Sequence, residues 1–348
     1  MAKIKIKISN LYKVFGDNPK AAMEHVRNGA TKQSLLDDHR HVLGLRDINI
    51  DIPEKKIKVV MGLSGSGKST LIRHINRLIE PTEGQVIVDG EDVLAMSQEE
   101  LREFRRHKSS MVFQKFALLP HRTVAQNAAY GLTIQGIAEG EAAERAQRWI
   151  DRVGLGGFEN HFPAQLSGGM QQRVGLARAL ATDAEILLMD EAFSALDPLI
   201  RTDMQDILLD LQEELHKTIV FITHDLDEAL RIGDQIAILR DGESIQQGDP
   251  QDIILRPADD YISDFIKDIN RGRVIEVRSV MAKAARASGP KLPMDTALED
   301  ALQTLASVGK DTGTVVDHDG KTIGKIDINA AITAMARPDR GTSQPRYK

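Results

Sequence analysis

The chain has 348 residues, of which 41% are hydrophobic and 28% charged, enough to form a large folded domain and a second, smaller one. Its formal net charge of −6 argues against a general nucleic-acid-binding protein, because such proteins carry a basic excess. The chain contains no cysteine, so disulfides, thiolate metal sites and cysteine nucleophiles are excluded.

The N-terminal segment predicts two strands separated by an insertion. Residues 3–8 alternate lysine with isoleucine, a period-two pattern typical of a strand rather than of a signal peptide. Residues 17–44 are polar and helix-permissive, and a second alternating run follows at 46–53. No run approaches the roughly 18 apolar residues of a membrane span, so we expect any role at a bilayer to depend on partners.

Residues 62–69, GLSGSGKS, match the phosphate-binding pattern G-x-x-x-x-G-K-[ST], between an apolar strand and a helical apolar spacing, as this motif requires. Backbone N–H groups of such a loop hold phosphate oxygens, Lys68 reaches the β- and γ-phosphates, and the Ser69 hydroxyl binds Mg²⁺. The alternative is a flexible Gly/Ser turn before a helix. The nucleotide-binding residues expected here are Gly62, Ser64, Gly65, Ser66, Gly67, Lys68, Ser69 and Thr70.

The chain then alternates strands with helices. The expected elements are a strand and turn at 84–93, a charged helix at 97–108, helices over 137–182 with a break at 154–165, a buried strand at 185–193, an amphipathic helix at 198–216, a buried strand at 217–225 and a hairpin at 235–250. This order predicts an α/β fold with a largely parallel sheet, whose ligands lie at the carboxyl ends of the strands.

Two carboxylates end the strand in ILLMDE. Asp190 is placed to hold the Mg²⁺ shell, and Glu191 is placed to polarise an attacking water molecule. A strand ending in solvated carboxylates is the alternative, which the phosphate loop elsewhere in the chain makes weaker.

Three further polar residues follow strands in the same way. Gln114 carries a side chain able to bind both metal and water, and His224 is placed to donate a hydrogen bond to the γ-phosphate. Each also fits an ordinary surface position, and Asp197 fits a turn before Pro198. Their order and their strand-end placement favour the catalytic interpretation.

Five motifs occur along the chain in the order GLSGSGKST, FQ, LSGGMQQR, LLMDEAFSALD and ITHD. Together they resemble the nucleotide-binding domain of ABC transporters over residues 5–250. The resemblance implies a mixed-sheet P-loop ATPase domain with a helical subdomain, acting as a head-to-tail homodimer that holds two ATP molecules with Mg²⁺ at its interface. It also implies that the second glycine-rich loop completes the partner's site, through Ser167, Gly168, Gly169 and Gln171. Ser167 as the N-cap of a helix is the simpler interpretation, and both can hold at once.

The same resemblance assigns three more features. Phe15 would stack on adenine, with Tyr12 as the other aromatic nearby and with burial of Phe15 in the core as the alternative. Asp197 would couple the two sites of the dimer. Residues 115–127, KFALLPHRTVAQN, would dock a helix of a membrane subunit through their apolar side chains.

Four features look like those of the ATPases of glycine betaine, proline betaine and choline importers. They are the insertion, the exact sequence of residues 60–84, the FALLPHRTV loop and the segment beyond DYISDFI. That resemblance implies permease partners, an extracytoplasmic substrate-binding protein, no nucleic acid, and a place at the cytoplasmic face of the inner membrane. Recognition of a quaternary amine needs an aromatic cage, which a chain with 4% aromatics does not offer. An ABC importer of another solute, a soluble ABC-type ATPase and a non-enzymatic regulator are the alternatives.

Near residues 270–295 the sequence lacks a long periodic run and contains a Gly-Pro pair, which predicts a domain boundary. The ATPase domain is then expected at 1–270, with its helical subdomain at about 97–182. The strand–helix–strand–strand–helix order of residues 279–337 resembles a single cystathionine-β-synthase (CBS) motif, an α+β module that relatives use to respond to ionic strength or a nucleotide. The last twelve residues hold four basic and one acidic side chain, a net +3, so we expect 338–348 to form a disordered basic tail.

Overall fold

The computed structural model describes residues 3–114, 117–194 and 196–336. It divides into two compact units, Met1–Gln247 and Gly248–Lys348. Among the helices of these described ranges, none combines the length and apolar character that crossing a bilayer requires. The predicted basic tail at 338–348 lies outside the described residues, as do residues 115 and 116 of the predicted docking stretch.

The first unit begins with an antiparallel sheet, ordered β2-β1-β4-β5. Its strands are β1 (Ile4–Phe15), β2 (Val42–Pro53), β4 (Glu83–Val88) and β5 (Glu91–Asp92). Alternation places Ile6 and Ile8 of β1 and the three isoleucines of β2 in the core, whereas Ile4 is exposed. Lys5 interrupts this pattern, because its side chain is buried and pairs with Asp89 at 2.7 Å and with Glu185 of the neighbouring sheet.

The second sheet is ordered β10-β9-β3-β8-β7-β6, and its strands from β9 to β6 are parallel, as predicted. Its strands are β3 (Ile57–Met61), β6 (Ser109–Val112), β7 (Ile186–Asp190), β8 (Thr218–Thr223), β9 (Gln235–Arg240) and β10 (Glu243–Gly248). Helix α3 (Lys68–Ile75) packs with both sheets in one apolar core. Helices α8 (Pro198–Leu215) and α9 (Leu226–Ile232) connect the later strands.

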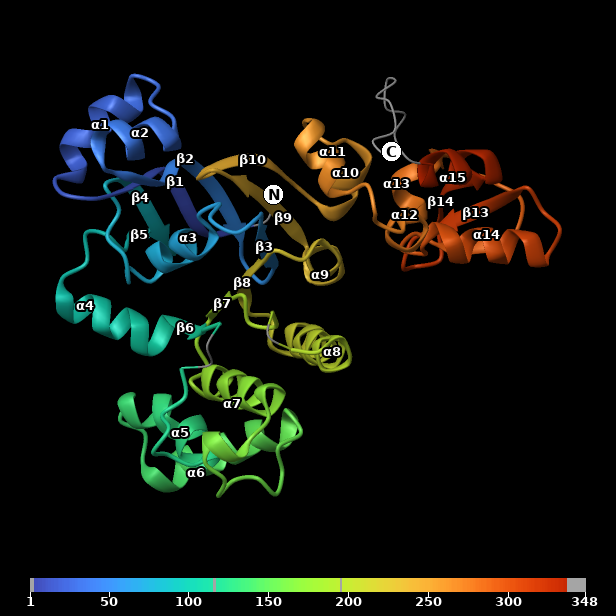
Figure 1. The fold of residues 1–348 in the computed structure, drawn as a ribbon. Helices are drawn as coiled ribbons and strands as arrows, with labels where there is room; N and C mark the ends of the chain where they lie inside the picture. Colours follow the sequence, from blue (N-terminus) through green and yellow to red (C-terminus); the bar gives the residue numbers. More distant parts are fainter. Residues whose placement is uncertain (1–2, 115–116, 195, 337–348) are drawn as a thin grey trace, which may run out of the picture. The chain divides into compact units, whose positions relative to one another are not determined.

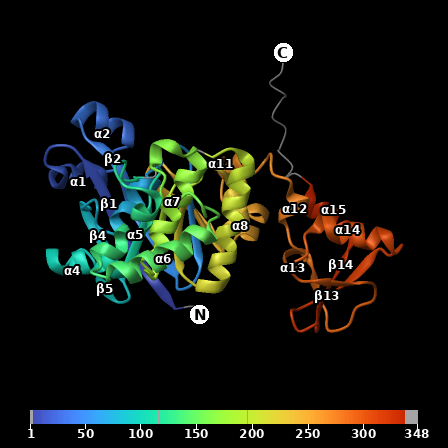
Figure 2. The same cartoon turned by 90° about the horizontal axis from the view of Figure 1, so that it is seen from below.

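A group of helices stands beyond β6 (Figure 1). It contains α5 (Val124–Ile134), α6 (Glu139–Arg152) and α7 (Gly168–Ala181), which pack on one another, with a short 3₁₀ turn at Pro163–Gln165. The charged helix before it is α4 (Gln98–Glu103), which continues as a π-helix over Phe104–Lys108. Figure 2 shows α6 and α7 at the front beside α8. The sequence had indicated the other helices but not α5, which begins with a Thr123–Gln126 capping box.

The predicted insertion forms two short helices, α1 (Pro19–Arg27) and α2 (Lys32–His39). They pack on the ends of β1 and β2 (Figure 1) through a small apolar cluster of their own. This cluster contains Val14, Ala22, Met23, Val26, Leu35 and Leu43. The insertion is therefore a folded part of the first unit.

The second unit starts earlier than the boundary that the sequence indicated near 270. Helices α10 (Pro250–Leu255), α11 (Asp260–Phe265), α12 (Arg271–Val274) and α13 (Val277–Val280) belong to it. A buried side chain joins these helices to the rest of the unit. The Arg271 guanidinium donates hydrogen bonds to the carbonyl oxygens of Ala334 at 2.9 Å and Ile254 at 3.1 Å. The change of sequence pattern near residue 270 therefore lies inside this unit.

The rest of the second unit has the element order expected from the sequence. A sheet ordered β11-β14-β13-β12 carries two helices, α14 (Leu298–Ser307) and α15 (Ile328–Met335). Its strands are β11 (Ala282–Lys283), β12 (Lys291–Pro293), β13 (Thr312–Val316) and β14 (Thr322–Asp327). It is a small α+β unit, and β12 runs parallel to β13 while β14 runs antiparallel to it.

Candidate active site

The phosphate loop joins the end of β3 to the start of α3. Two of its glycines are structurally required. A Cβ on Gly62 would lie 2.1 Å from the Leu239 carbonyl oxygen, and Gly67 has φ 101° with the Gly44 carbonyl 2.7 Å from where its Cβ would be. The hydroxyl of Ser66, buried within the loop, has no hydrogen-bond partner among the described residues. The loop is therefore shaped as an anion cradle at a helix N-terminus.

Lys68 is the first residue of α3, and its side chain is only 4% exposed. Its ammonium donates to the carbonyl oxygens of Gly62 at 2.8 Å and Leu63 at 3.1 Å. Burial lowers the pKa of Lys68, and the Glu191 carboxylate at 3.7 Å acts in the opposite direction. The lysine is thus held at the phosphate loop by groups that phosphate oxygens can replace as acceptors.

Asp190 ends β7 and is buried beside the start of α3. It accepts a hydrogen bond from the Ser69 hydroxyl at 2.7 Å and another from Arg73 at 3.0 Å. Two of the three residues that the sequence placed around Mg²⁺, Ser69 and Asp190, are therefore in contact. The sequence analysis missed Arg73, although its place one turn along the same helix was the available signal.

Glu191 is the point on which distant segments converge. Its carboxylate lies 3.0 Å from Gln114 Nε2, 3.6 Å from His224 Nδ1 and 3.7 Å from Lys68 Nζ. Its backbone has φ 47°, an uncommon conformation for a residue with a side chain, and its N–H donates to the Ile222 carbonyl. Three strand ends therefore bring one carboxylate, one amide and one imidazole together beside the phosphate loop, as expected from the order of the parallel strands.

The second glycine-rich loop lies in the helical group rather than beside the phosphate loop. Ser167 caps α7 by accepting a hydrogen bond from Met170 N at 3.3 Å, and Gln171 donates to the Leu166 carbonyl at 3.2 Å. A Cβ on Gly169 would lie 2.9 Å from Ile200 of α8. Gly168 stands in open space at the first helical position. The loop therefore abuts the start of α8.

Asp197 is the N-cap of α8, where its carboxylate accepts a hydrogen bond from Ile200 N at 3.1 Å. The capping role that the sequence allowed for Ser167 is present, and Asp197, for which the sequence had allowed a turn before Pro198, caps a helix as well. Because Ile200 touches Gly169, these two capped helix starts lie next to each other.

Phe15 lies at the end of β1 and is 38% exposed, so it is not a core residue. Its ring packs against Gly44, whose carbonyl oxygen in turn lies against Gly67 of the phosphate loop. Tyr12, by contrast, is half-buried against the cluster under the insertion. Phe15 is thus a partly exposed aromatic near the phosphate loop, with the Lys13 ammonium 4.8 Å from its ring centroid.

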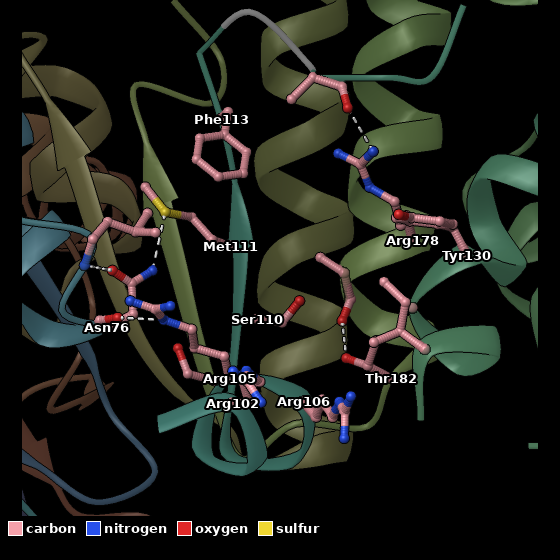
Figure 3. A pocket seen from close by; sticks show the side chains of 16 residues that line it. Asn76, Arg102, Arg105, Arg106, Ser110, Met111, Phe113, Tyr130, Arg178 and Thr182 are labelled. Carbon is pink, nitrogen blue, oxygen red and sulfur yellow. Dashed lines mark hydrogen bonds between the residues drawn. The ribbon is translucent and has the colours of Figure 1, made fainter. Parts of the chain in front are cut away.

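A separate cavity of about 570 Å³ opens between β6, the π-helix and the helical group (Figure 3). Arg102, Arg105 and Arg106 gather at one end of it, with Phe113 at the other end in the same view. The remaining wall includes Arg178, which donates to the Ala117 carbonyl at 2.7 Å. The cavity is therefore lined by four arginines, of which Arg102 and Arg106 also pair with Glu99 and Glu103, and it borders the stretch that follows Gln114.

Comparison with known proteins agrees with this geometry. Residues 45–194 match the ABC transporter family model. The chain is 47% identical to the glycine betaine transport ATP-binding protein OpuAA of Bacillus subtilis (strain 168), over 94% of this chain and 79% of that protein. It is also 47% identical to the glycine betaine/proline betaine transport system ATP-binding protein ProV of Escherichia coli (strain K12), over 96% and 83%.

Among solved structures, the fold is similar to a dimeric ATP-binding cassette, MJ0796, in a post-hydrolysis state bound to ADP and Pi. The TM-score is 0.61 at 33% identity, over 70% of this chain and 98% of that one. The chain therefore belongs to the ATP-binding proteins of the ABC transporter family, and it is an ABC-type ATPase.

Proposed function

We propose that this chain energises an importer of a quaternary ammonium osmolyte, namely glycine betaine, proline betaine or choline. The observation that carries the proposal is the extent of the similarity to OpuAA and ProV. It spans 94–96% of the chain, so it includes the insertion and the second unit as well as the ATPase core. The substrate itself would be recognised by other subunits, because this chain supplies the hydrolysis.

Glu191 is the residue that we assign as general base. Its carboxylate is placed to orient a water molecule and accept its proton, while Gln114 and His224 hold that carboxylate in position. Lys68 and the loop N–H groups would stabilise the charge on the transferred phosphoryl group. His224, with a side chain 56% exposed, is free to reorient toward the γ-phosphate.

The residues present also fit Mg²⁺ delivered with the nucleotide. Within the described ranges, no group of three or more histidine, aspartate or glutamate side chains gathers closely enough to hold a metal alone. Mg²⁺ in nucleotide sites is held by one or two protein oxygens together with phosphate oxygens. Ser69 and Asp190 already meet at 2.7 Å, and with Gln114 they would complete such a shell, in which the metal neutralises phosphate charge.

Phe15 is proposed to stack on the adenine ring. Replacing it with alanine should weaken ATP binding by about fivefold or more, because base–aromatic stacking contributes about 1–3 kcal/mol. Phe15→Tyr should bind ATP like the original chain, since the ring is kept. Titration of both variants with a fluorescent ATP analogue checks this, and equal affinities for the alanine and tyrosine variants would contradict the assignment.

The dimer is proposed to place the second glycine-rich loop of each chain on the γ-phosphate held by the other. Ser167, Gly168, Gly169 and Gln171 would supply this contact, and Asp197 would link the two sites. Support comes from the adjacency of the capped starts of α7 and α8, and from the dimeric cassette that the fold resembles.

A permease helix is proposed to dock at this arginine-lined cavity. Leu119, two residues after the cavity-lining Ala117, is fixed by Asn127, whose buried amide accepts from Leu119 N at 2.8 Å and donates to Leu119 O at 3.1 Å. A rigid loop beside an arginine-lined cavity suits a helix that presents apolar and acidic side chains.

The second unit is proposed to be a CBS-like regulatory module. Support comes from its β12–α14–β13–β14–α15 order, which follows the strand–helix–strand–strand–helix order expected from the sequence and occurs once within the described residues. Regulation by ionic strength or by a nucleotide would then act through this unit.

One transport experiment tests the importer and its regulation together. Cells whose own quaternary-amine transporters have been deleted would carry this chain with its permease and binding protein. Uptake of labelled glycine betaine, proline betaine and choline would be measured at low and high osmolality, for the original chain, Glu191→Gln and a chain ending at residue 336. We expect uptake of at least one of the three to require Glu191.

If none of the three solutes is taken up while the purified chain still hydrolyses ATP, the substrate assignment is wrong and the ATPase assignment stands. If the chain ending at residue 336 keeps the response of the original chain to osmolality, the basic tail takes no part in regulation.

A further inference from the structure

The start of helix α2 is fixed against the ATPase core. Thr31 caps this helix by accepting a hydrogen bond from Ser34 N at 3.1 Å. The Arg46 guanidinium donates to the Ala30 carbonyl, one residue before the cap, and to Glu243 of β10 at 3.0 Å. The first residue of α2 is therefore held at a defined place relative to β2 and β10.

That first residue is Lys32, and it reaches the phosphate loop. Its ammonium donates to the Gly65 carbonyl oxygen at 2.7 Å, at the exposed outer turn of the loop. The next carbonyl, of Ser66, accepts from Gly242 N at 3.1 Å. The outer turn is thus held by one contact from the insertion and one from the β9–β10 turn.

The ammonium of Lys32 forms no ion pair with another described residue, although Asp241 and Glu243 line the cavity that Lys32 borders. In the part of the chain that the structure describes, no Asp or Glu lies within ion-pair distance of its ammonium. A half-buried cation beside an anion cradle attracts polyphosphate, with an interaction of about 1 kcal/mol per unit charge at 4 Å in water. Holding the Gly65 carbonyl outward also keeps this oxygen away from bound phosphate oxygens, which it would repel.

The cavity that Lys32 borders has a volume of about 570 Å³ and lies between α2, β2 and the β9–β10 turn. Val42 lines the same cavity and is the strand partner of Phe15. The start of α2 therefore contacts the phosphate loop and shares a cavity with Val42, the strand partner of Phe15.

We propose that Lys32, contributed by the insertion, is a positioning residue of the nucleotide site that favours binding of the nucleoside triphosphate. It acts through the Gly65 carbonyl and through its positive charge. The proposal rests on the ATP site and is independent of which solute is transported.

The test compares four purified full-length chains: the original, Lys32→Gln, Lys32→Arg and Lys20→Gln. Lys20→Gln is the matched control, because Lys20 is an exposed lysine in the first turn of α1 and the substitution removes the same charge. The dissociation constants of ATP and ADP would be measured at about 0.05 M and about 0.5 M salt, together with thermal unfolding and ATPase kinetics.

We expect Lys32→Gln to raise the Kd of ATP about fivefold at low salt, more than that of ADP, and to raise KM with kcat nearly unchanged. The effect should shrink at high salt, and Lys32→Arg should restore most of the affinity. The proposal is overturned if Lys32→Gln behaves like Lys20→Gln. It is also overturned if Lys32→Gln and Lys32→Arg lose affinity equally and unfold at lower temperature, which would make the contact a packing contact. Failure of the original chain to bind ATP would instead contradict the ATP site itself.

Discussion

The chain carrying Glu191→Gln is expected to bind ATP normally and to hydrolyse it at least about a hundredfold more slowly, because an amide cannot accept the proton of the attacking water. The substitution keeps the size of the side chain and its position beside Gln114, His224 and Lys68. Since the γ-phosphate is then retained, an ATP-bound dimer should accumulate. Phosphate release measures the first effect, and size-exclusion chromatography with and without ATP measures the second.

Glu213→Gln is the control for this substitution, because Glu213 is exposed on α8, away from the site. It should leave both hydrolysis and dimerisation unchanged. Hydrolysis by Glu191→Gln within about threefold of the original rate would rule out Glu191 as the general base.

Ser167→Asp is expected to abolish hydrolysis while leaving the fold intact. Aspartate is as good an N-cap as serine, so α7 should keep its cap and the unfolding temperature should change little. In the proposed dimer, however, the new carboxylate would face the γ-phosphate of the partner's site, and like charges brought together in an interface cost several kcal/mol. Ser167→Asn, which caps equally well without charge, is the control and should retain more activity.

Mixing two inactive chains then tests whether the site is shared between chains. A Lys68→Ala chain lacks the phosphate-loop lysine, and a Ser167→Asp chain lacks a usable second loop. In a head-to-tail dimer of one of each, one site combines both defects and the other has none. Random pairing of equal amounts makes half of the dimers mixed, so up to about a quarter of the original activity should return. If the mixture stays inactive and forms no ATP-dependent dimer, the shared-site arrangement is not supported.

Much of the site could be predicted from the sequence because its parts are local. The phosphate loop is one continuous stretch in which Gly62 and Gly67 are required by close backbone approaches, and the caps at Ser167 and Asp197 lie within three residues of the N–H groups that they bind. Gln114, Glu191 and His224 each follow a parallel strand, and the carboxyl ends of such strands share an edge. Their convergence could therefore be expected before any contact was known.

Other features depended on contacts between distant parts of the chain. Arg73 meets Asp190 across 117 positions of sequence, and Lys32 meets Gly65 because Arg46 fixes the start of α2. The second compact unit begins at Gly248, and within it Arg271 bonds to Ala334, a contact that no local change of composition reveals.

The sequence by itself thus determined that this protein is an ABC-type ATPase and indicated most of its strands and helices in order, and it predicted the candidate site residues. Only the tertiary structure decided which surface polar residues join the site, how the insertion meets the phosphate loop and where the second unit begins. Backbone propensity and motif spacing act over a few residues, whereas these contacts depend on how the sheets and helices pack.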